Sequence, residues 1–70
     1  MVQAKEYFVL GDQTVAKFKV VVGDGSGTVE AVIQKGEVVD HTIMFDGPIE
    51  LREQITKEAQ QEMEQLANRI

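Results

Sequence analysis

The C-terminal third of the chain carries the pattern that most limits its fold, because apolar residues recur there at spacings of three or four. Such spacings place apolar side chains in one stripe along a helix whose other faces are polar. Asp46-Gly47-Pro48 precedes the pattern, and proline suits the first helical position while Asp46 or Gly47 can cap the helix. The sequence predicts a helix at about residues 48–69, with a stripe formed by Leu51, Ile55, Ala59, Met63, Leu66 and Ile70.

This stripe needs an apolar surface to pack against, and the preceding residues are typical of strands. From Thr14 to Val22, apolar and other side chains alternate with the period of a strand that buries one face. Similar segments separated by glycine-containing turns predict strands at about residues 7–10, 14–22, 28–34 and 38–45. We therefore expect an α+β fold in one domain over residues 1–70, a four-stranded antiparallel β-meander packed on one face by a C-terminal amphipathic helix, ββββα.

The turns decide which residues face each other. The glycine-rich run at residues 23–27 predicts a hairpin turn, with a four-residue loop at residues 24–27. The expected cross-strand pairs are Val22 with Val29, Val20 with Ala31, Phe18 with Ile33, Lys19 with Val32 and Lys17 with Gln34.

The turn at Lys35-Gly36-Glu37 poses a problem of parity. A plain two-residue loop there misaligns the apolar rows by one position, so we expect a three-residue loop or a bulge at Gly36. The following strand should then carry four residues on the core side, namely Val39, His41, Ile43 and Phe45.

Length and composition limit the function. A chain of 70 residues without cysteine has a small core and no disulfide or thiolate zinc site, which favours association with a second copy. The net charge of −5 disfavours unaided binding to nucleic acid or to an anionic membrane. No apolar run is long enough to span a bilayer, and the first residues do not resemble a signal peptide, so we expect a cytoplasmic protein that does not bind membranes.

Three features invite a functional interpretation, and each has a simpler structural one. The run at residues 23–27 contains a single carboxylate and leads into a strand, which favours a turn over a calcium or phosphate loop. His41 has no partner in any catalytic motif, so a structural role is favoured. The acids of the helix are expected to be solvated, and they are Glu50, Glu53, Glu58, Glu62 and Glu64. We predict no catalytic residue, no metal and no cofactor.

The second face of the sheet is the predicted partner-facing surface, because one helix can shield only one face. Its apolar content favours a non-enzymatic interaction or accessory module that self-associates through this face or through edge strands, with a further protein partner also possible. The residues assigned to it are Tyr7, Val9, Val15, Lys17, Lys19, Val21, Val32, Val38 and Met44.

Two alternative functions belong to other classes. The order of four strands and a helix resembles the single-stranded-DNA-binding transcriptional coactivator domain, which dimerises and grips DNA with its sheet. That resemblance implies phosphate contacts from Lys17 and Lys19 and base stacking on Tyr7. The charge of the chain, with Glu30 and Asp40 on the same face, opposes it. The third alternative is a small enzyme whose site lies at a dimer interface.

Overall fold

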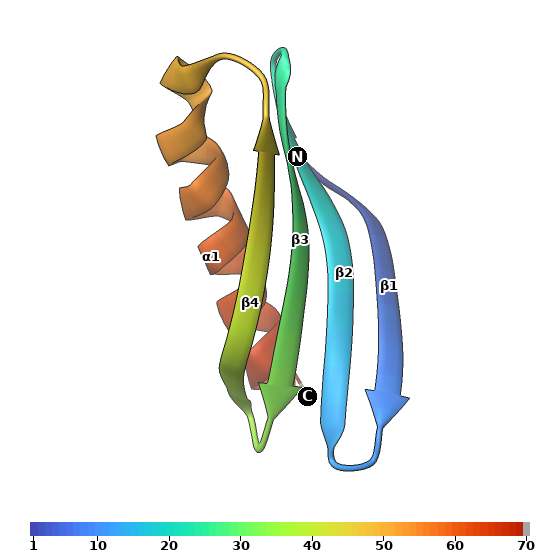
Figure 1. Cartoon of the computed structure of the whole chain (residues 1–70). Coiled ribbons are helices and arrows are strands. Elements are labelled where there is room, and N and C mark those ends of the chain that lie inside the picture. Colours follow the sequence, from blue (N-terminus) through green and yellow to red (C-terminus); the bar gives the residue numbers. More distant parts are fainter. Residues whose placement is uncertain (70) are drawn as a thin grey trace.

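The computed structural model describes residues 1–69 and contains four antiparallel strands in one open sheet, with a helix against one face (Figure 1). The elements are β1 (Val2–Leu10), β2 (Gln13–Val22), β3 (Gly25–Gln34), β4 (Glu37–Asp46), the 3-10 turn η1 (Ile49–Leu51) and the helix α1 (Arg52–Arg69). Strand order in the sheet follows the sequence, β1-β2-β3-β4. The predicted ββββα arrangement is confirmed, with a longer first strand than expected. Ile70 of the predicted stripe lies outside the described residues.

Each hairpin turns within two residues. Gly23 has a φ of 55°, a left-handed conformation that suits glycine, and it forms the β2–β3 turn with Asp24. The predicted four-residue loop is therefore wrong, because Gly25 and Gly27 belong to β3. Its pairs are replaced by Val22 with Gly25, Val20 with Gly27, Phe18 with Val29, Lys19 with Thr28 and Lys17 with Glu30. The partner of Val22 moves by an even number of residues, so each side chain of β2 and β3 keeps its predicted face.

A bulge in β4 restores the parity that the short Lys35-Gly36 turn disturbs. Ile33 pairs with Val38, but Val32 pairs with Asp40, so Val39 is the extra residue. A three-residue loop or a bulge at Gly36 was expected, but the bulge lies at Val39. As a result Val38 packs against the core, whereas Val39 is 51 % exposed. The predicted core position of Val39 and the predicted second-face position of Val38 are both wrong.

The core lies between α1 and the inner face of β2, β3 and β4. Its buried residues are Ala16, Phe18, Val20, Val29, Ala31 and Ile33 from the sheet, and Ile55, Ala59, Met63, Leu66 and Ala67 from the helix. Ile43 and Phe45 of β4 are partly buried against this cluster, on the same face as His41, as predicted. The helical stripe and the strand alternation thus meet in one apolar layer.

Two glycines bring the helix close to β3. A Cβ atom at Gly27 would lie 2.7 Å from Cγ2 of Ile55, and one at Gly25 would lie 3.0 Å from Cδ1 of the same side chain. Contacts under 3 Å are not tolerated without movement of the neighbour. Gly25 and Gly27 therefore let the start of α1 pack closely against β3.

The helix starts later than predicted. Pro48 has an extended backbone, with φ −62° and ψ 134°, and it caps η1 without a side-chain hydrogen bond. The N–H of Leu51 donates to the carbonyl oxygen of Pro48 at 3.0 Å, and α1 itself begins at Arg52. Neither Asp46 nor Gly47 caps α1, because a 3-10 turn separates them from it.

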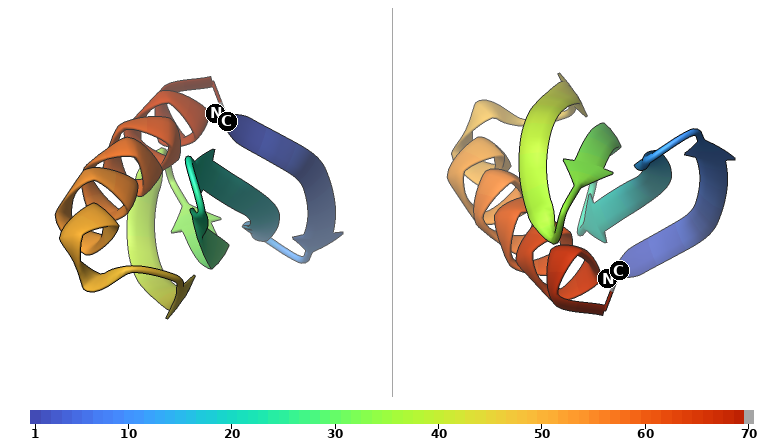
Figure 2. Two further views of the ribbon diagram at one scale, coloured as in Figure 1. Left: turned by 90° about the horizontal axis from the view of Figure 1, so that it is seen from above. Right: turned by 90° about the horizontal axis from the view of Figure 1, so that it is seen from below.

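The helix leaves most of β1 uncovered. Figure 2 shows α1 lying beside β4, β3 and β2, while β1 curves away from it at the far edge of the sheet. Both ladder edges of the sheet, β1 and β4, pair on one side only. Of these, β1 is covered only near its start, where Val2 packs against the core, so its second half is the least shielded part of the sheet.

Candidate interaction surface

The end of β1 exposes four consecutive apolar side chains. The exposed fractions are 48 % for Tyr7, 46 % for Phe8, 74 % for Val9 and 64 % for Leu10. Successive residues of a strand point to opposite faces, so this segment is apolar and exposed on both sides. Contiguous apolar exposure on an edge strand is typical of a surface that another chain covers. We call residues 7–10 the β1 apolar segment.

Tyr7 and Val9 lie on the helix-bearing face, which corrects their predicted position on the second face. Tyr7 pairs with Ala16 and Val9 pairs with Thr14, and directly paired residues share a face. The physical reason is the two-residue turn after Leu10, which pairs odd positions of β1 with even positions of β2.

Phe8 and Leu10 occupy the second face instead, and neither belongs to the surface predicted from the sequence. Phe8 pairs with Val15, and Val15 pairs with Val32, so an apolar row crosses three strands. The signal that identifies Phe8 was present in the sequence, because a tight Gly11-Asp12 turn fixes the parity of β1.

The remaining residues assigned to the second face do lie there: Val15, Lys17, Lys19, Val21, Val32 and Met44. Lys17 is central to this face, with Nζ 5.6 Å from the centroid of the Phe8 ring. The same Nζ lies 3.8 Å from Oε2 of Glu30 on the neighbouring strand. One of the two lysines is thus already neutralised by a carboxylate.

A shallow apolar groove separates the β1 apolar segment from the end of the helix. It has a volume of about 410 Å³, and its walls are Tyr7, Val9 and Thr14 from the sheet and Leu66 and Arg69 from α1. The groove exists because α1 lies over the neighbouring strands and not over β1. Among the described residues 1–69, its lining offers an apolar surface and one cation, Arg69.

The other half of β1 is held to the helix by charges. Lys5 Nζ lies 2.9 Å from Oε2 of Glu62, and the amino group of Met1 lies 3.5 Å from Oε1 of Glu58. Glu62 is only 8 % exposed, so its predicted role as a solvated acid is wrong. Glu62 lies at the edge of the apolar stripe of α1, where the partly exposed Lys5 side chain contacts it. Of the other predicted surface acids, Glu50, Glu53 and Glu64 are exposed, whereas Glu58 is half-buried.

A bulge marks the boundary between the two halves of β1. Gln3 pairs with Lys19, but Glu6 pairs with Lys17, so Ala4 and Lys5 together oppose one residue. Ala4 has a φ of 53°, which is unusual for a residue with a side chain. The longest uninterrupted pairing of β1 therefore runs from Glu6 to Leu10.

His41 is exposed on β4, and within residues 1–69 its side chain makes no hydrogen bond. A hollow beside it is lined by Val38, Gln60, Met63 and Glu64, and Asp40 points to the opposite face, as predicted. The backbone N–H of His41 donates to Oδ1 of Asp40 at 2.9 Å. No group of three or more His, Asp or Glu residues among residues 1–69 is arranged to hold a metal ion.

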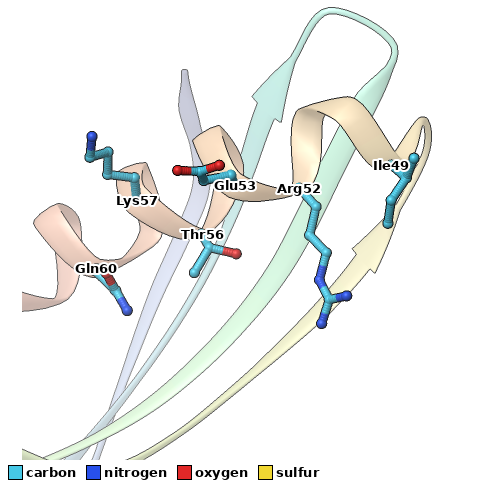
Figure 3. A pocket seen from close by; sticks show the side chains of 6 residues that line it. All are labelled: Ile49, Arg52, Glu53, Thr56, Lys57 and Gln60. Atoms are coloured by element: carbon cyan, nitrogen blue, oxygen red, sulfur yellow. The ribbon is translucent and has the colours of Figure 1, made fainter.

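A second hollow lies along the side of the helix. Figure 3 shows its lining side chains projecting from η1 and the first half of α1: Ile49, Arg52, Glu53, Thr56, Lys57 and Gln60. It is open to solvent, and no ion pair joins Glu53 to Lys57 in the part of the chain that the structure describes.

No similarity to a known protein indicates a function for this chain. No protein-family model, no curated protein and no solved structure matches the chain. Within residues 1–69, the helix is not long and apolar enough to cross a membrane.

Proposed function

We propose that this protein is a non-enzymatic interaction module that associates with a second copy of itself. The observation that supports this proposal is the β1 apolar segment, which is exposed on both faces of an edge strand. Covering such a segment with another chain gains hydrophobic free energy and removes a site of non-specific aggregation.

A second copy is favoured by the size of the chain. A core of about this size stabilises a domain only marginally, and small domains without disulfides or metals gain stability from association. Self-association adds buried apolar area at the strand that α1 does not cover. We place this module in the cytoplasm and assign it no cofactor.

The absence of enzymatic activity is part of the proposal. The hollows described above lack a nucleophile paired with a base, and His41 stands at an exposed edge with only Asp40 bonded to its backbone. A dimer would add the groove lined by Tyr7 and Leu66, whose character is apolar. Such a groove suits protein contact better than catalysis.

Single-stranded nucleic acid is a second candidate, favoured by one observation. Phe8 and Lys17 lie together on the second face, and an aromatic ring beside a cation can stack a base and contact a phosphate. Tyr7, the residue implied by the coactivator resemblance, is on the other face. Lys17 is also paired with Glu30, and the chain has a net charge of −5, so we rank this candidate below self-association.

Sedimentation velocity tests the proposal at micromolar concentrations. The wild-type chain should sediment as a dimer, and Val9→Lys should shift it toward monomer because a charge in the β1 apolar segment cannot be buried unpaired. Met44→Lys is the matched control, since Met44 is similarly exposed, at 68 %, but lies on β4. A wild-type chain that remains monomeric throughout this range contradicts the proposal.

A further inference from the structure

We infer that two copies pair antiparallel through β1, about a twofold axis that passes beside Phe8, and so form one continuous sheet with both helices on the same face. This inference rests on the proposed function and adds the surface, the register and the symmetry. It follows from which backbone groups of β1 are free, which registers a twofold axis allows and where the charges lie.

In the regular half of β1, from Glu6 to Leu10, the free backbone groups are those of Tyr7 and Val9. Residues that flank a two-residue turn form a hydrogen-bonded pair, which here is Leu10 with Gln13. Bonded and non-bonded pairs alternate along an antiparallel ladder, so Phe8 also directs its N–H and C=O toward β2. Tyr7 and Val9 direct theirs to the open edge, where a second copy can accept and donate hydrogen bonds.

Symmetry restricts the register. In a continuous sheet a twofold axis perpendicular to the sheet keeps each face on the same side, and directly opposed residues must share a face. Opposed residues of two β1 strands must therefore both be even or both be odd, so the axis passes beside one residue paired with its own copy. The candidates within the β1 apolar segment are Tyr7, Phe8 and Val9.

Phe8 is the candidate that gives the best match. With the axis there, Tyr7 opposes Val9 of the second copy and Glu6 opposes Leu10, so all five residues from Glu6 to Leu10 pair. No like charges meet in this register, and both faces gain apolar contacts.

The two neighbouring registers are worse. An axis at Val9 places Glu6 opposite Asp12 of the second copy, which brings two carboxylates together. An axis at Tyr7 requires Lys5 to oppose Val9, but Lys5 lies in the bulge beside Ala4 and is bound to Glu62. The bulge thus limits pairing to the regular half of β1.

The other edge of the sheet is protected against pairing. β4 carries Glu37, Asp40 and Asp46, and its bulge at Val39 interrupts the ladder. The N–H of His41 is already occupied by the Asp40 side chain. Acidic residues, a bulge and a satisfied edge amide are the devices by which natural sheets avoid edge association.

Pairing through β1 also closes the apolar groove. Tyr7 and Val9 of each copy meet on the helix-bearing face, beside Leu66 and Arg69, so the two grooves become one shared apolar layer. On the opposite face, the two Phe8 rings meet between the two Lys17 side chains. Each exposed residue of the β1 apolar segment thereby gains a partner.

Single-cysteine variants test this arrangement, because the natural chain has no cysteine. Opposed residues at a non-hydrogen-bonded antiparallel position have Cα atoms about 4.5 Å apart, within the range for a disulfide. Under mild oxidation, Phe8→Cys should form a covalent dimer at least about tenfold faster than Tyr7→Cys, Val9→Cys or the β4 control Met44→Cys. The diagonal positions are about 7–8 Å apart, too far for a disulfide without backbone movement.

The outcomes separate the register from the proposed function. If the loss of the Phe8 ring makes the reduced Phe8→Cys chain monomeric, a second experiment replaces it. Tyr7→Cys and Val9→Cys chains are then mixed in equal amounts and oxidised, and the disulfide between one chain of each kind should form in preference to either homodimer. Faster cross-linking of Val9→Cys or Tyr7→Cys alone, or of Met44→Cys, overturns the Phe8-centred arrangement even if the wild type is dimeric. A monomeric wild type overturns the proposed function itself.

Discussion

Gly27→Ala is the substitution whose effect follows most directly from the packing of α1 on β3. In an unhindered strand, replacing glycine by alanine stabilises a protein by about 0.5–1 kcal/mol, because the unfolded chain loses freedom. Here the added Cβ would lie 2.7 Å from Cγ2 of Ile55, a side chain that is fully buried. The two effects oppose each other, so the sign of the change is informative.

The close contact with Ile55 should destabilise the fold by more than the reduced freedom of the unfolded chain stabilises it. Inserting a methyl group into a filled core costs about 1–3 kcal/mol, and Ile55 has no solvent into which it can move. The net loss should be about 1–2 kcal/mol, or about 4–16 °C in Tm for a domain of this size. Thermal unfolding followed by circular dichroism at fixed protein concentration measures it, with Ser26→Ala, on the opposite face, as a control that should change stability by less than about 0.5 kcal/mol.

A double-mutant cycle tests whether the loss of stability in Gly27→Ala comes from the contact with Ile55. Ile55→Ala removes Cγ2 and alone should cost about 2–5 kcal/mol. In that background, Gly27→Ala should lose its penalty, giving a coupling of about 1–2 kcal/mol. If Gly27→Ala is as stable as the wild type, the inference that these glycines admit the helix is wrong.

Two further predictions concern charged residues. Lys5→Met should destabilise the fold because it leaves the buried Glu62 carboxylate without its cation, and Glu62→Gln should remove most of that penalty. Urea unfolding of both single variants and the double variant should give a coupling near 1 kcal/mol, since Lys5 remains partly exposed, and strictly additive effects would contradict the ion pair. At physiological salt, the protein should bind single-stranded DNA or RNA only weakly, because Glu30 offsets Lys17. Fluorescence anisotropy that shows submicromolar, salt-sensitive binding, lost in Lys17→Ala and Lys19→Ala, would instead favour the nucleic-acid candidate.

The element order was predictable because two periodicities divide the chain cleanly. The alternation up to Phe45 and the stripe from Leu51 onward depend on local spacing, which is visible in the sequence. Register was less accessible, because it depends on whether each turn has two residues or more. Treating Gly25 and Gly27 as loop residues displaced the β2–β3 pairing, although their actual role is contact with Ile55.

The candidate surface was predictable in part for the same reason. Val15, Lys17 and Val32 lie on the second face as their alternation indicates, whereas Tyr7 and Val9 were assigned to the wrong face because the parity of β1 was taken one position off. The role of Glu62 was not accessible, because its partner Lys5 lies on β1, far from α1 in the sequence. Contacts between distant segments require the folded chain.

Amide hydrogen exchange tests the central claim, association through the edge of β1, most directly. The account predicts that the N–H groups of Tyr7 and Val9 exchange rapidly in dilute samples and become protected as protein concentration rises, while the edge amides of β4 do not change. NMR-detected exchange across the monomer–dimer transition would show this residue by residue. Concentration-dependent protection confined to β4 or to α1, with Tyr7 and Val9 unchanged, would contradict the account.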